Sequence, residues 1–496
     1  MSTHHPLMTQ RNKFLWLFLV ILGIIGVALI LLSTHYGAFL SDDSYFYIEP
    51  ARSALLGNGF NPSPTFAPLL PAVLLLLGKL GAEPLTAVRY LNAFLFGLNI
   101  ILTGAIAKGA GLSDLFAGLT ALLVVLSNVL LQMYGWAMSE ALYQTLILVS
   151  VFLFALYLKR PSYLWLILTA VAAALACLTR YAALPLVLTL VVILLIYDTT
   201  RPFLSRLWRS VVLGFISLAP IGAYLVRNIL VSGRATHYHS FSFVPFTMAR
   251  LTWYLYNTLD WFVPGRFING HEIIAGVLFA CLLIGAGIIT YRIHRSQRLS
   301  QDGSFAITLL WITFIVLNFL MLFLAGGLSG LTADNTRYLA PIFWAFLFIL
   351  VYFLDLLWKT GSQPARFLVT IFSLLFIVYN ADRSYTYLKS TYDAGLGYSG
   401  VGWYTSETIT YLKRHPNIEV VSTGDMGIYF WTGKLPASIT AFGGAAGLRQ
   451  HLCQTGASLF ILNSMPVDIY HMNLQDITQG LTLVYKFNDS SMYQCK

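Results

Sequence analysis

Charged side chains are scarce in this chain of 496 residues. Asp, Glu, Lys and Arg make up 10% of it, whereas soluble globular proteins carry about 25%. Apolar residues make up 57% instead. This balance excludes an ordinary soluble enzyme. The formal net charge is +10, from 30 basic and 20 acidic residues. Such an excess can indicate a nucleic-acid partner, or it can reflect basic residues placed on one side of a membrane, so the positions of these residues decide its meaning.

Cysteine is scarce too, and no Cys or His spacing typical of a metal site is present. Two of the four cysteines, Cys177 and Cys281, fall in apolar stretches, where thiols pack as small apolar groups. Cys453 and Cys495 share a polar C-terminal region. The sequence is compatible there with a disulfide between them and equally with two free thiols. The chain also lacks a nucleophile elbow that would bring Ser, His and Asp together.

Long apolar stretches are abundant. A helix needs about 20 mostly apolar residues to cross about 30 Å of hydrocarbon. We expect eleven spans, at residues 14–33, 86–107, 114–131, 138–158, 162–179, 181–197, 210–230, 271–291, 304–325, 338–357 and 366–380. The first is too long for a signal-peptide core and lacks a small-residue cleavage site, so we expect an uncleaved anchor.

Basic residues gather at every second break between these spans, as the positive-inside rule expects of cytoplasmic loops. Those loops and the N-terminal tail hold thirteen basic and four acidic residues, a difference of +9. The net charge is therefore a topology signal, and no nucleic-acid partner is expected. We predict a multi-pass protein of the plasma membrane, the inner membrane of a bacterium, with a cytoplasmic N-terminus and an extracytoplasmic C-terminus.

Two regions depart from this pattern of spans. Residues 66–80 (FAPLLPAVLLLLGKL) form a helix of about 22 Å, too short to cross, and a crossing there would make every later basic loop external. We therefore expect a re-entrant or surface-lying helix. After residue 380 the chain is polar, with a predicted helix near 405–415 and β-like runs at 418–423, 458–462 and 481–487. We divide the chain into a transmembrane domain, 1–380, and a small extracytoplasmic α/β domain, 381–496.

The first external loop, residues 34–65, contains the most informative polar pattern. Asp42 and Asp43 stand together at the start of a predicted short helix, and Tyr47 shares a face with Asp43 at a spacing of four residues. Repulsion between adjacent carboxylates raises one pKa, which favours a general base or a cation site. The alternative is a helix cap with a solvated neighbour. The spacing alone leaves both open.

Other ionisable residues stand at external span ends. Glu140 begins one span, and Arg180, Arg227 and Arg337 end or begin others. Charges at membrane depth are costly and usually face a cavity or a partner, and arginine suits phosphate oxygens. Three converging arginines would clamp a phosphate, whereas separate ones would anchor the spans at the interface. The pair His237 and His239 lies in an external loop, where we favour a solvated or substrate-contacting role over a metal site.

The glycine-rich stretch GLGYSG, residues 395–400, has the glycine spacing of a dinucleotide fingerprint. No predicted strand precedes it, and it lies just outside the membrane. We interpret it as a linker.

Several stretches, in this order, resemble motifs of the GT-C glycosyltransferases, specifically the family 39 or protein-mannosyltransferase-like group that uses polyprenyl-phosphate sugars. SDDSYFYIEPARSALLGNGF, from residue 41, is similar to the first-loop signature of that group. MSEALYQ, LTRYAALP and NTRYLAP, from residues 138, 178 and 335, are similar to its span-end motifs. YTSETITYLKRHPNIEVVSTGDMGIYFWTG, from residue 404, is similar to the start of its external domain.

This resemblance implies a polytopic α-helical GT-C-like fold in which residues 1–380 are catalytic. It implies an inverting glycosyltransferase, hexosyl or pentosyl, that moves a sugar from a polyprenyl-phosphate donor to an acceptor hydroxyl on the extracytoplasmic face. The acceptor, whether lipid, cell-envelope glycan or protein, stays open. So does the use of Mg or Mn, which suit oxygen-rich sites.

The same resemblance assigns roles to individual residues. Asp43 becomes the catalytic acidic residue, with Asp42 beside it in place of the second carboxylate of many relatives. Glu140 becomes a second acidic residue and a metal contact in some relatives, so a metal would involve Asp42, Asp43 and Glu140. Arg180, Arg227 and Arg337 become the residues that bind the donor phosphate. The substrate-contacting residues are Tyr47, Arg52, Tyr181, His237, His239, Asn335 and Tyr338.

Two other functions remain as alternatives. A secondary transporter also has many spans and buried charges, but no internal repeat relates the halves of this chain, and a transporter needs no acidic loop and external domain. A membrane polysaccharide polymerase or ligase would place Arg and His chemistry in a late external loop. The segment 231–270, with Arg234, Arg250 and Arg266 beside the two histidines, fits that description.

Overall fold

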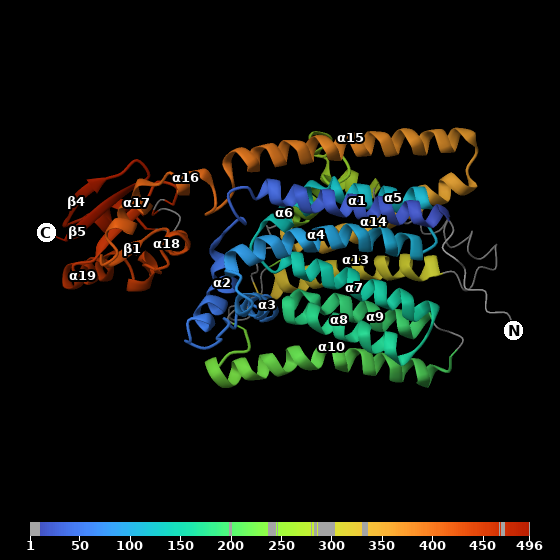
Figure 1. Ribbon diagram of the computed structural model, residues 1–496, viewed down its shortest axis with the longest axis horizontal. Helices are drawn as coiled ribbons and strands as arrows, with labels where there is room; N and C mark the ends of the chain where they lie inside the picture. The colour runs from blue at the N-terminus through green and yellow to red at the C-terminus, as the bar shows by residue number, and fades with distance from the viewer. Residues whose placement is uncertain are drawn as a thin grey trace.

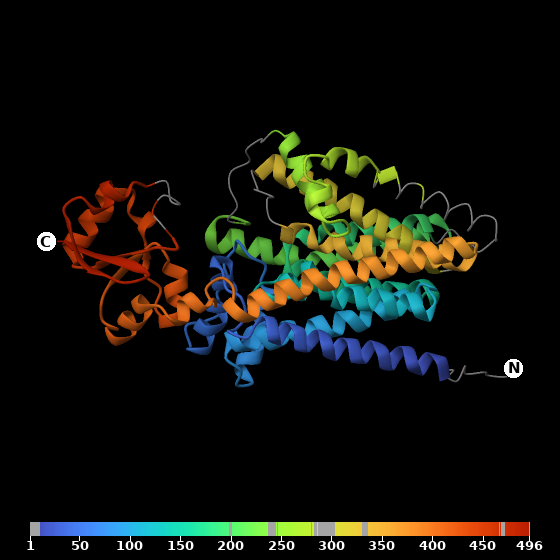
Figure 2. The same cartoon turned by 90° about the horizontal axis from the view of Figure 1, so that it is seen from above.

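The chain folds into a long helical bundle with a small sheet domain at its C-terminal end (Figures 1 and 2). The computed structural model describes residues 10–197, 201–236, 247–278, 303–329, 336–465 and 472–495, with a few isolated positions between these ranges. The bundle consists of α1 (Gln10–Ser33), α4 (Pro84–Gly109), α5 (Asp114–Val125), α6 (Asn128–Gly135), α7 (Glu140–Lys159), α8 (Tyr163–Thr179), α9 (Leu184–Tyr197), α10 (Phe203–Ser232), α13 (Gly303–Ser329), α14 (Ala340–Thr360) and α15 (Gln363–Ala394). The short helix α11 (Met248–Leu259) lies between α10 and α13 in the chain.

Seven of the described helices are long and apolar enough to cross a membrane, namely α1, α4, α7, α10, α13, α14 and α15. The pair α5 and α6 is bent by 52° and makes an eighth if it forms one broken span. The predicted spans 162–179 and 181–197 are helical but shorter than a full crossing, and 271–291 lies largely outside the described residues. The chain is therefore a multi-pass membrane protein, and the count of eleven spans stays a prediction.

The helices differ in how much of their apolar surface the protein covers. In α14, 72% of the apolar window is buried inside the protein, compared with 22% in α10 and 17% in α15. Large apolar side chains such as Phe215, Leu230 and Leu368 cover the outer faces of these two helices. Exposing so much apolar surface to water would be unfavourable, whereas contact with the hydrocarbon of a membrane has no such cost. Hence α14 occupies the interior of the bundle, and α10 and α15 lie at its rim (Figure 1).

The first loop contains two helices at the end of the bundle that faces the sheet domain (Figure 1). In α2 (Asp42–Leu55) the two acidic residues occupy the first turn, where the helix dipole stabilises negative charge. The backbone N–H of Ser41 donates to Ser44 Oγ at 3.1 Å and fixes the start of this helix. The second helix, α3 (Leu69–Lys79), has 11 residues and a length of about 16 Å. It packs against α2 and α4 and is too short to cross.

The C-terminal region contains a five-stranded sheet, which confirms a small α/β unit. Its strands are β1 (Val420–Ser422), β2 (Ala437–Ser438), β3 (Ser458–Leu462), β4 (Leu481–Lys486) and β5 (Ser490–Cys495), in the order β2-β1-β3-β5-β4. β1 is parallel to β2 and β3, and β5 is antiparallel to β3 and β4. The helices are α16 (Val401–Tyr404), α17 (Glu407–Arg414), α18 (Asp425–Thr432), α19 (Ala445–Thr455) and α20 (Leu474–Thr478).

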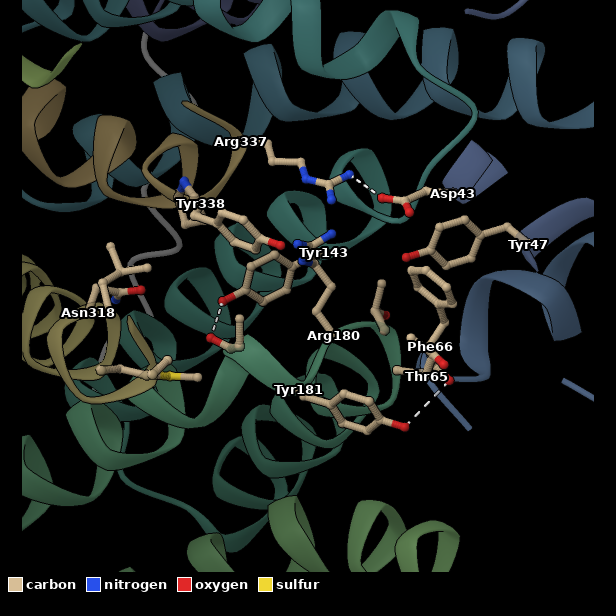
Figure 3. Close-up of a pocket in the computed structure, with 17 residues that line it drawn as sticks. Asp43, Tyr47, Thr65, Phe66, Tyr143, Arg180, Tyr181, Asn318, Arg337 and Tyr338 are labelled. Carbon is tan, nitrogen blue, oxygen red and sulfur yellow. Dashed lines mark hydrogen bonds and ion pairs between the residues drawn. The ribbon is translucent and has the colours of Figure 1, made fainter. Parts of the chain in front are cut away.

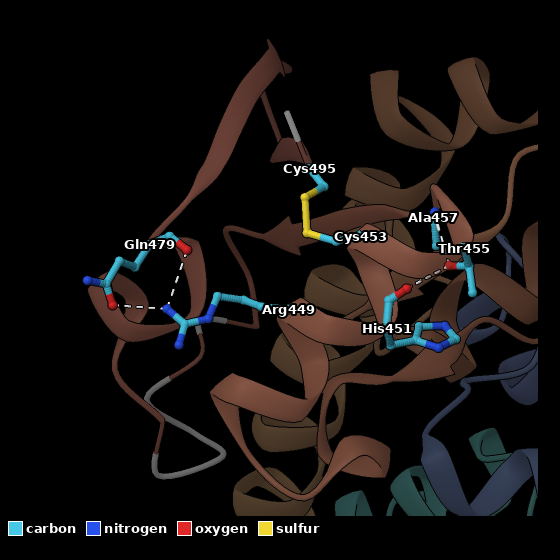
Figure 4. Close-up of a disulfide and its surroundings, with 7 residues drawn as sticks. All are labelled: Arg449, His451, Cys453, Thr455, Ala457, Gln479 and Cys495. Carbon is cyan, nitrogen blue, oxygen red and sulfur yellow. Dashed lines mark hydrogen bonds between the residues drawn. A yellow bond between two sulfur atoms is a disulfide. The ribbon is translucent and has the colours of Figure 1, made fainter.

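The predicted helix near 405–415 corresponds to α17, and the three predicted β runs correspond to β1, β3 and β4. α15 continues past residue 380 to Ala394, so one helix connects the bundle to the sheet domain. The domain division between residues 380 and 381 stays a prediction. A disulfide joins Cys453 of α19 to Cys495 of β5 and closes a loop over a sequence separation of 42 (Figure 4).

Candidate active site

Four charged side chains from four parts of the chain meet at the domain-facing end of the bundle. Asp43 is in the first turn of α2, and Glu140 is the first residue of α7. Arg180 lies between α8 and the 3-10 turn Tyr181–Ala183, and Arg337 lies in the 3-10 turn Thr336–Tyr338 that precedes α14. Each residue therefore lies where a helix starts or ends, and the ends of membrane-spanning helices lie near the membrane surface.

These side chains form a chain of ion pairs, of which Figure 3 shows the pair of Asp43 and Arg337. Arg337 Nη1 lies 2.6 Å from Asp43 Oδ2, and Arg337 Nε lies 3.9 Å from Glu140 Oε1. The same oxygen of Glu140 accepts a hydrogen bond from Arg180 Nη1 at 2.6 Å. Two carboxylates and two guanidinium groups thus balance in charge. A phosphate entering here would meet cations that are already held in place.

Burial makes this balance necessary. Glu140 is only 3% exposed, and its Oε2 atom has no hydrogen-bond partner among the described residues. Burial opposes the charged form of both arginines and is the largest single influence. The negative charge of Glu140, joined at Arg337 by that of Asp43, is part of the surroundings that together outweigh it and raise the pKa of Arg180 and of Arg337 above the usual arginine value. Both guanidinium groups therefore remain positive under all physiological conditions.

Two cavities flank the ion pair of Asp43 and Arg337, and both residues line both cavities. The first, about 190 Å³, is mainly apolar and is lined by Tyr47, Phe66, Tyr143, Arg180, Tyr181, Asn318 and Tyr338 among others (Figure 3). The second, about 570 Å³, is more polar and is lined by Ser41, Asp42, Gln132, Glu140, Tyr387 and Leu396 among others. Asp43 can therefore contact ligands from two directions.

Aromatic residues hold the walls of the first cavity. The hydroxyl of Tyr47 lies 3.0 Å from Ser139 Oγ, and burial raises the pKa of Tyr47, so it is a neutral phenol. The hydroxyl of Tyr181 donates to the carbonyl of Pro64 at 3.0 Å and ties the first loop to the bundle. The ring of Tyr338 lies near both arginines, 5.8 Å from the guanidinium of Arg180 and 5.4 Å from that of Arg337.

Other predicted site residues lie elsewhere. Arg227 lines neither cavity; it donates to Asn61 Oδ1 at 3.0 Å and to Asn228 Oδ1 at 3.1 Å. Arg52 lines neither cavity either and donates through Nε to Glu83 Oε1 at 2.8 Å. His237, His239 and Asn335 lie outside the described residues.

The arrangement around the acidic pair does not resemble a preformed metal centre. No group of three or more His, Cys, Asp or Glu side chains that could hold a metal ion occurs in the described parts of the chain. Arg337 neutralises Asp43, and Arg180 neutralises Glu140.

The C-terminal domain contributes residues that sequence reasoning missed. The hydroxyl of Tyr398 donates to Asp42 Oδ1. Asp425, at the start of α18, also faces this region: burial raises the pKa of its carboxyl, and the negative charge of Asp42 raises it further. In the sequence, only the glycine spacing of residues 395–400 marked the segment that contains Tyr398, and we interpreted that segment as a linker. The contact was missed because nothing local links residue 398 to residue 42.

Known proteins share this architecture. A family model described as dolichyl-phosphate-mannose-protein mannosyltransferase matches residues 78–232. ArnT from Cupriavidus metallidurans in the apo state aligns at a TM-score of 0.61 and 14% identity, over 98% of each chain. The same protein bound to undecaprenyl phosphate aligns at 0.52 and 13% identity, over 96% of this chain and 97% of that one.

The oligosaccharyltransferase of Archaeoglobus fulgidus, in complex with zinc and sulfate, aligns at a TM-score of 0.57 and 13% identity, over 96% of this chain and 73% of that one. No curated protein matches the sequence of the chain significantly. At identities this low, the alignments are evidence of shared architecture. The chain is a multi-pass membrane protein with the GT-C glycosyltransferase fold.

Proposed function

We propose that the chain is an inverting glycosyltransferase that moves a hexosyl or pentosyl group from a polyprenyl-phosphate donor to an acceptor hydroxyl on the extracytoplasmic face. The observation that carries this proposal is the ion pair of Asp43 and Arg337, placed where two cavities meet. One residue of the pair suits proton transfer and the other suits a phosphate. A neighbour of the same fold is ArnT bound to undecaprenyl phosphate, which supports a donor of this class.

The first cavity suits the donor. Its charged lining combines Arg180 and Arg337 with one carboxylate, Asp43, and side chains of α13 such as Met321 and Leu322 supply apolar walls. A polyprenyl phosphate has the matching chemistry, since its phosphate needs cations and its first isoprene units need apolar contact. Arg337 would then donate to a phosphate oxygen and to Asp43 together.

The second cavity suits the acceptor because it is more polar and opens beside both aspartates. In the proposed reaction Asp43 takes the proton of the acceptor hydroxyl, and the oxygen attacks the anomeric carbon from the face opposite the phosphate. The new glycosidic C–O bond forms as the bond between the anomeric carbon and the phosphate oxygen breaks. Arg180 and Arg337 stabilise the charge on the departing phosphate. A single displacement of this kind inverts the anomeric centre.

Replacing Asp43 with Asn tests the proposal. We expect Asp43→Asn to abolish sugar transfer while the purified chain still binds undecaprenyl phosphate, because the amide keeps the shape but cannot accept the proton. Transfer is measured by mass spectrometry of envelope glycans in a deletion strain that carries each variant, and binding by native mass spectrometry. The matched control is Asp393→Asn, an exposed carboxylate near the end of α15.

Full transfer by Asp43→Asn would contradict the assignment. Loss of product only with Arg or His changes in residues 231–270 would favour the polymerase or ligase instead. The same glycan profile identifies the sugar, because the deletion strain lacks one defined group.

A further inference from the structure

The stretch Gly395–Gly400, expected to be a linker, lies against the first loop. Gly397 forms a parallel β-bridge with Leu40, and the backbone N–H of Tyr398 donates to the carbonyl of Leu40 at 2.9 Å. The hydroxyl of Ser399 donates to the carbonyl of Ala38. The stretch is therefore a structural part of the first loop rather than a free connection.

A second bridge completes this arrangement on the other side. Phe39 pairs with Trp136: its backbone N–H donates to Gly135 O at 2.8 Å, and its carbonyl accepts from Ala137 N–H at 2.9 Å. Three segments, 38–40, 135–137 and 397–399, thus form a small three-stranded junction. Each segment leads directly to a polar group of the site: the first to the aspartate pair, the second to Ser139 and Glu140, and the third to the hydroxyl of Tyr398.

Residues of the C-terminal domain hold Tyr398 on the side away from the first loop. Its side chain is 6% exposed, and its ring packs edge-on against Trp403 at a centroid distance of 5.2 Å. Trp431 Nε1 donates to its carbonyl at 2.8 Å. The preceding Gly397 has a φ of +61°, and a Cβ atom there would lie 2.0 Å from the carbonyl oxygen of Leu40. The close approach that places Tyr398 therefore requires glycine.

The two aspartates differ in partners and in surroundings. Asp43 is bound by Arg337 and lines both cavities, whereas Asp42 accepts from Tyr398 and lines only the second. A hydrogen bond from a buried phenol to Oδ1 restricts the carboxylate to one orientation and leaves Oδ2 to accept from a ligand in that cavity. Leu396, from the same stretch, lines the same cavity.

We propose that Tyr398 is a positioning residue which, from the C-terminal side of the chain, orients Asp42 to bind a hydroxyl of the acceptor while Asp43 takes the proton. This inference rests on the proposed glycosyl transfer. It makes the C-terminal domain a part of the active site, and it divides the work of the two carboxylates. The acceptor is accordingly a polyhydroxylated group that enters through the second cavity.

Tyr398→Phe removes only the hydroxyl. We expect it to lower the initial rate of product formation roughly tenfold, the usual effect of losing one hydrogen bond to a charged group. Binding of undecaprenyl phosphate to the purified full-length chain should stay unchanged, because Asp42 does not line the first cavity. Rates are compared in the complemented deletion strain at equal protein levels. Tyr404→Phe is the matched control, since its hydroxyl donates to the carbonyl of Tyr36 and touches neither aspartate.

A double-mutant cycle separates positioning from stability. If Tyr398 acts through Asp42, Tyr398→Phe causes no further loss in an Asp42→Ala background. An equal loss in both backgrounds would overturn the inference, and so would a rate for Tyr398→Phe equal to that of Tyr404→Phe. If the Tyr398→Phe variant does not accumulate in cells, the Asp42→Ala variant tests the inference instead. A wild-type rate of transfer by Asp42→Ala would refute the role of Asp42, and with it the role of Tyr398.

The two proposals fail differently. A deletion strain that loses no sugar from its envelope glycans, together with a wild-type chain that binds no undecaprenyl phosphate, refutes the glycosyltransferase itself. If a defined sugar is lost in the deletion strain and the wild-type chain binds undecaprenyl phosphate, but Tyr398→Phe has no effect, only the role of Tyr398 is refuted.

Discussion

At the scale of single residues, the site depends on pairing charges that would be costly alone. Asp43 and Arg337 are 294 positions apart in the chain and lie 2.6 Å apart in space. Glu140, almost wholly buried, is neutralised mainly by Arg180 at 2.6 Å. Removing one partner of such a pair leaves an uncompensated charge, which costs more than the pair contributes.

The two arginines should therefore affect donor binding strongly. We predict that Arg180→Ala and Arg337→Ala each weaken binding of undecaprenyl phosphate on the order of tenfold or more, because each removes a charge-assisted hydrogen bond. Native mass spectrometry of the purified chain measures this binding. Arg266→Ala is the control, since Arg266 is exposed and lines neither cavity. A greater loss in the control than in either site variant would contradict the clamp and support the polymerase alternative.

Asp425 leads to a prediction about pH. Burial and the charge of Asp42 raise the pKa of Asp425 above its ordinary value. The carboxyl therefore stabilises the fold when protonated, and this contribution is lost as the pH rises through the raised pKa. Asp425→Asn, which cannot ionise, should raise the apparent melting temperature at pH 7 on the order of 1 °C. The difference from the wild type should vanish near pH 3; a variant less stable than the wild type at pH 7 would contradict the shift.

At the scale of elements, the ends of helices matter more than their middles. α2 and α7 begin with the carboxylates, Arg180 immediately precedes the turn before α9, and Arg337 lies in the turn before α14. α15 connects the bundle and the sheet domain through fixed contacts: Arg383 pairs with Asp260 at 2.6 Å, and Ser384 Oγ donates to the carbonyl of Leu126 at 2.6 Å. The domain is thereby held where Tyr398 can reach Asp42.

The disulfide stabilises the same small domain. It closes a loop with a sequence separation of 42, which is worth about 4 kcal/mol in the chain-entropy model. We predict that the double variant Cys453→Ser, Cys495→Ser lowers the melting temperature of the domain by several degrees, as near-UV circular dichroism would measure. Cys281→Ser, which removes an exposed free thiol, should have no such effect. Reaction of Cys453 with a maleimide in the absence of reductant would contradict the pairing.

At the scale of the whole molecule, α1 begins at the end of the bundle opposite the sheet domain (Figures 1 and 2). The basic residues that flank the break between α14 and α15, Lys359 and Arg366, indicate the cytoplasmic side. The sheet domain and the candidate site should accordingly be extracytoplasmic.

Labelling tests this orientation. In a Cys281→Ser background, a membrane-impermeant maleimide should modify Gln475→Cys in intact cells but Ser362→Cys only after permeabilisation. Both positions are exposed, one in the sheet domain and the other between α14 and α15. The reverse pattern would invert the topology and place the site on the cytoplasmic face.

Much of this architecture follows from the sequence alone. The helices of the bundle follow from apolar stretches of sufficient length, and the sheet domain from the change to alternating, polar sequence after residue 380. Glu140, Arg180 and Arg337 could be proposed for the site because a charge at membrane depth is too costly without a partner. These are local or compositional properties, which the order of residues determines directly.

The tertiary structure decided which of these groups meet. Local sequence cannot distinguish Arg337, which binds Asp43, from Arg227, which binds Asn61, because both are arginines at predicted external span ends. It also cannot show that Gly397 pairs with Leu40, since that contact joins segments more than 350 positions apart. Packing of the helices and docking of the C-terminal domain bring such groups together, and only then do their charges, burial and hydrogen bonds become properties of one site.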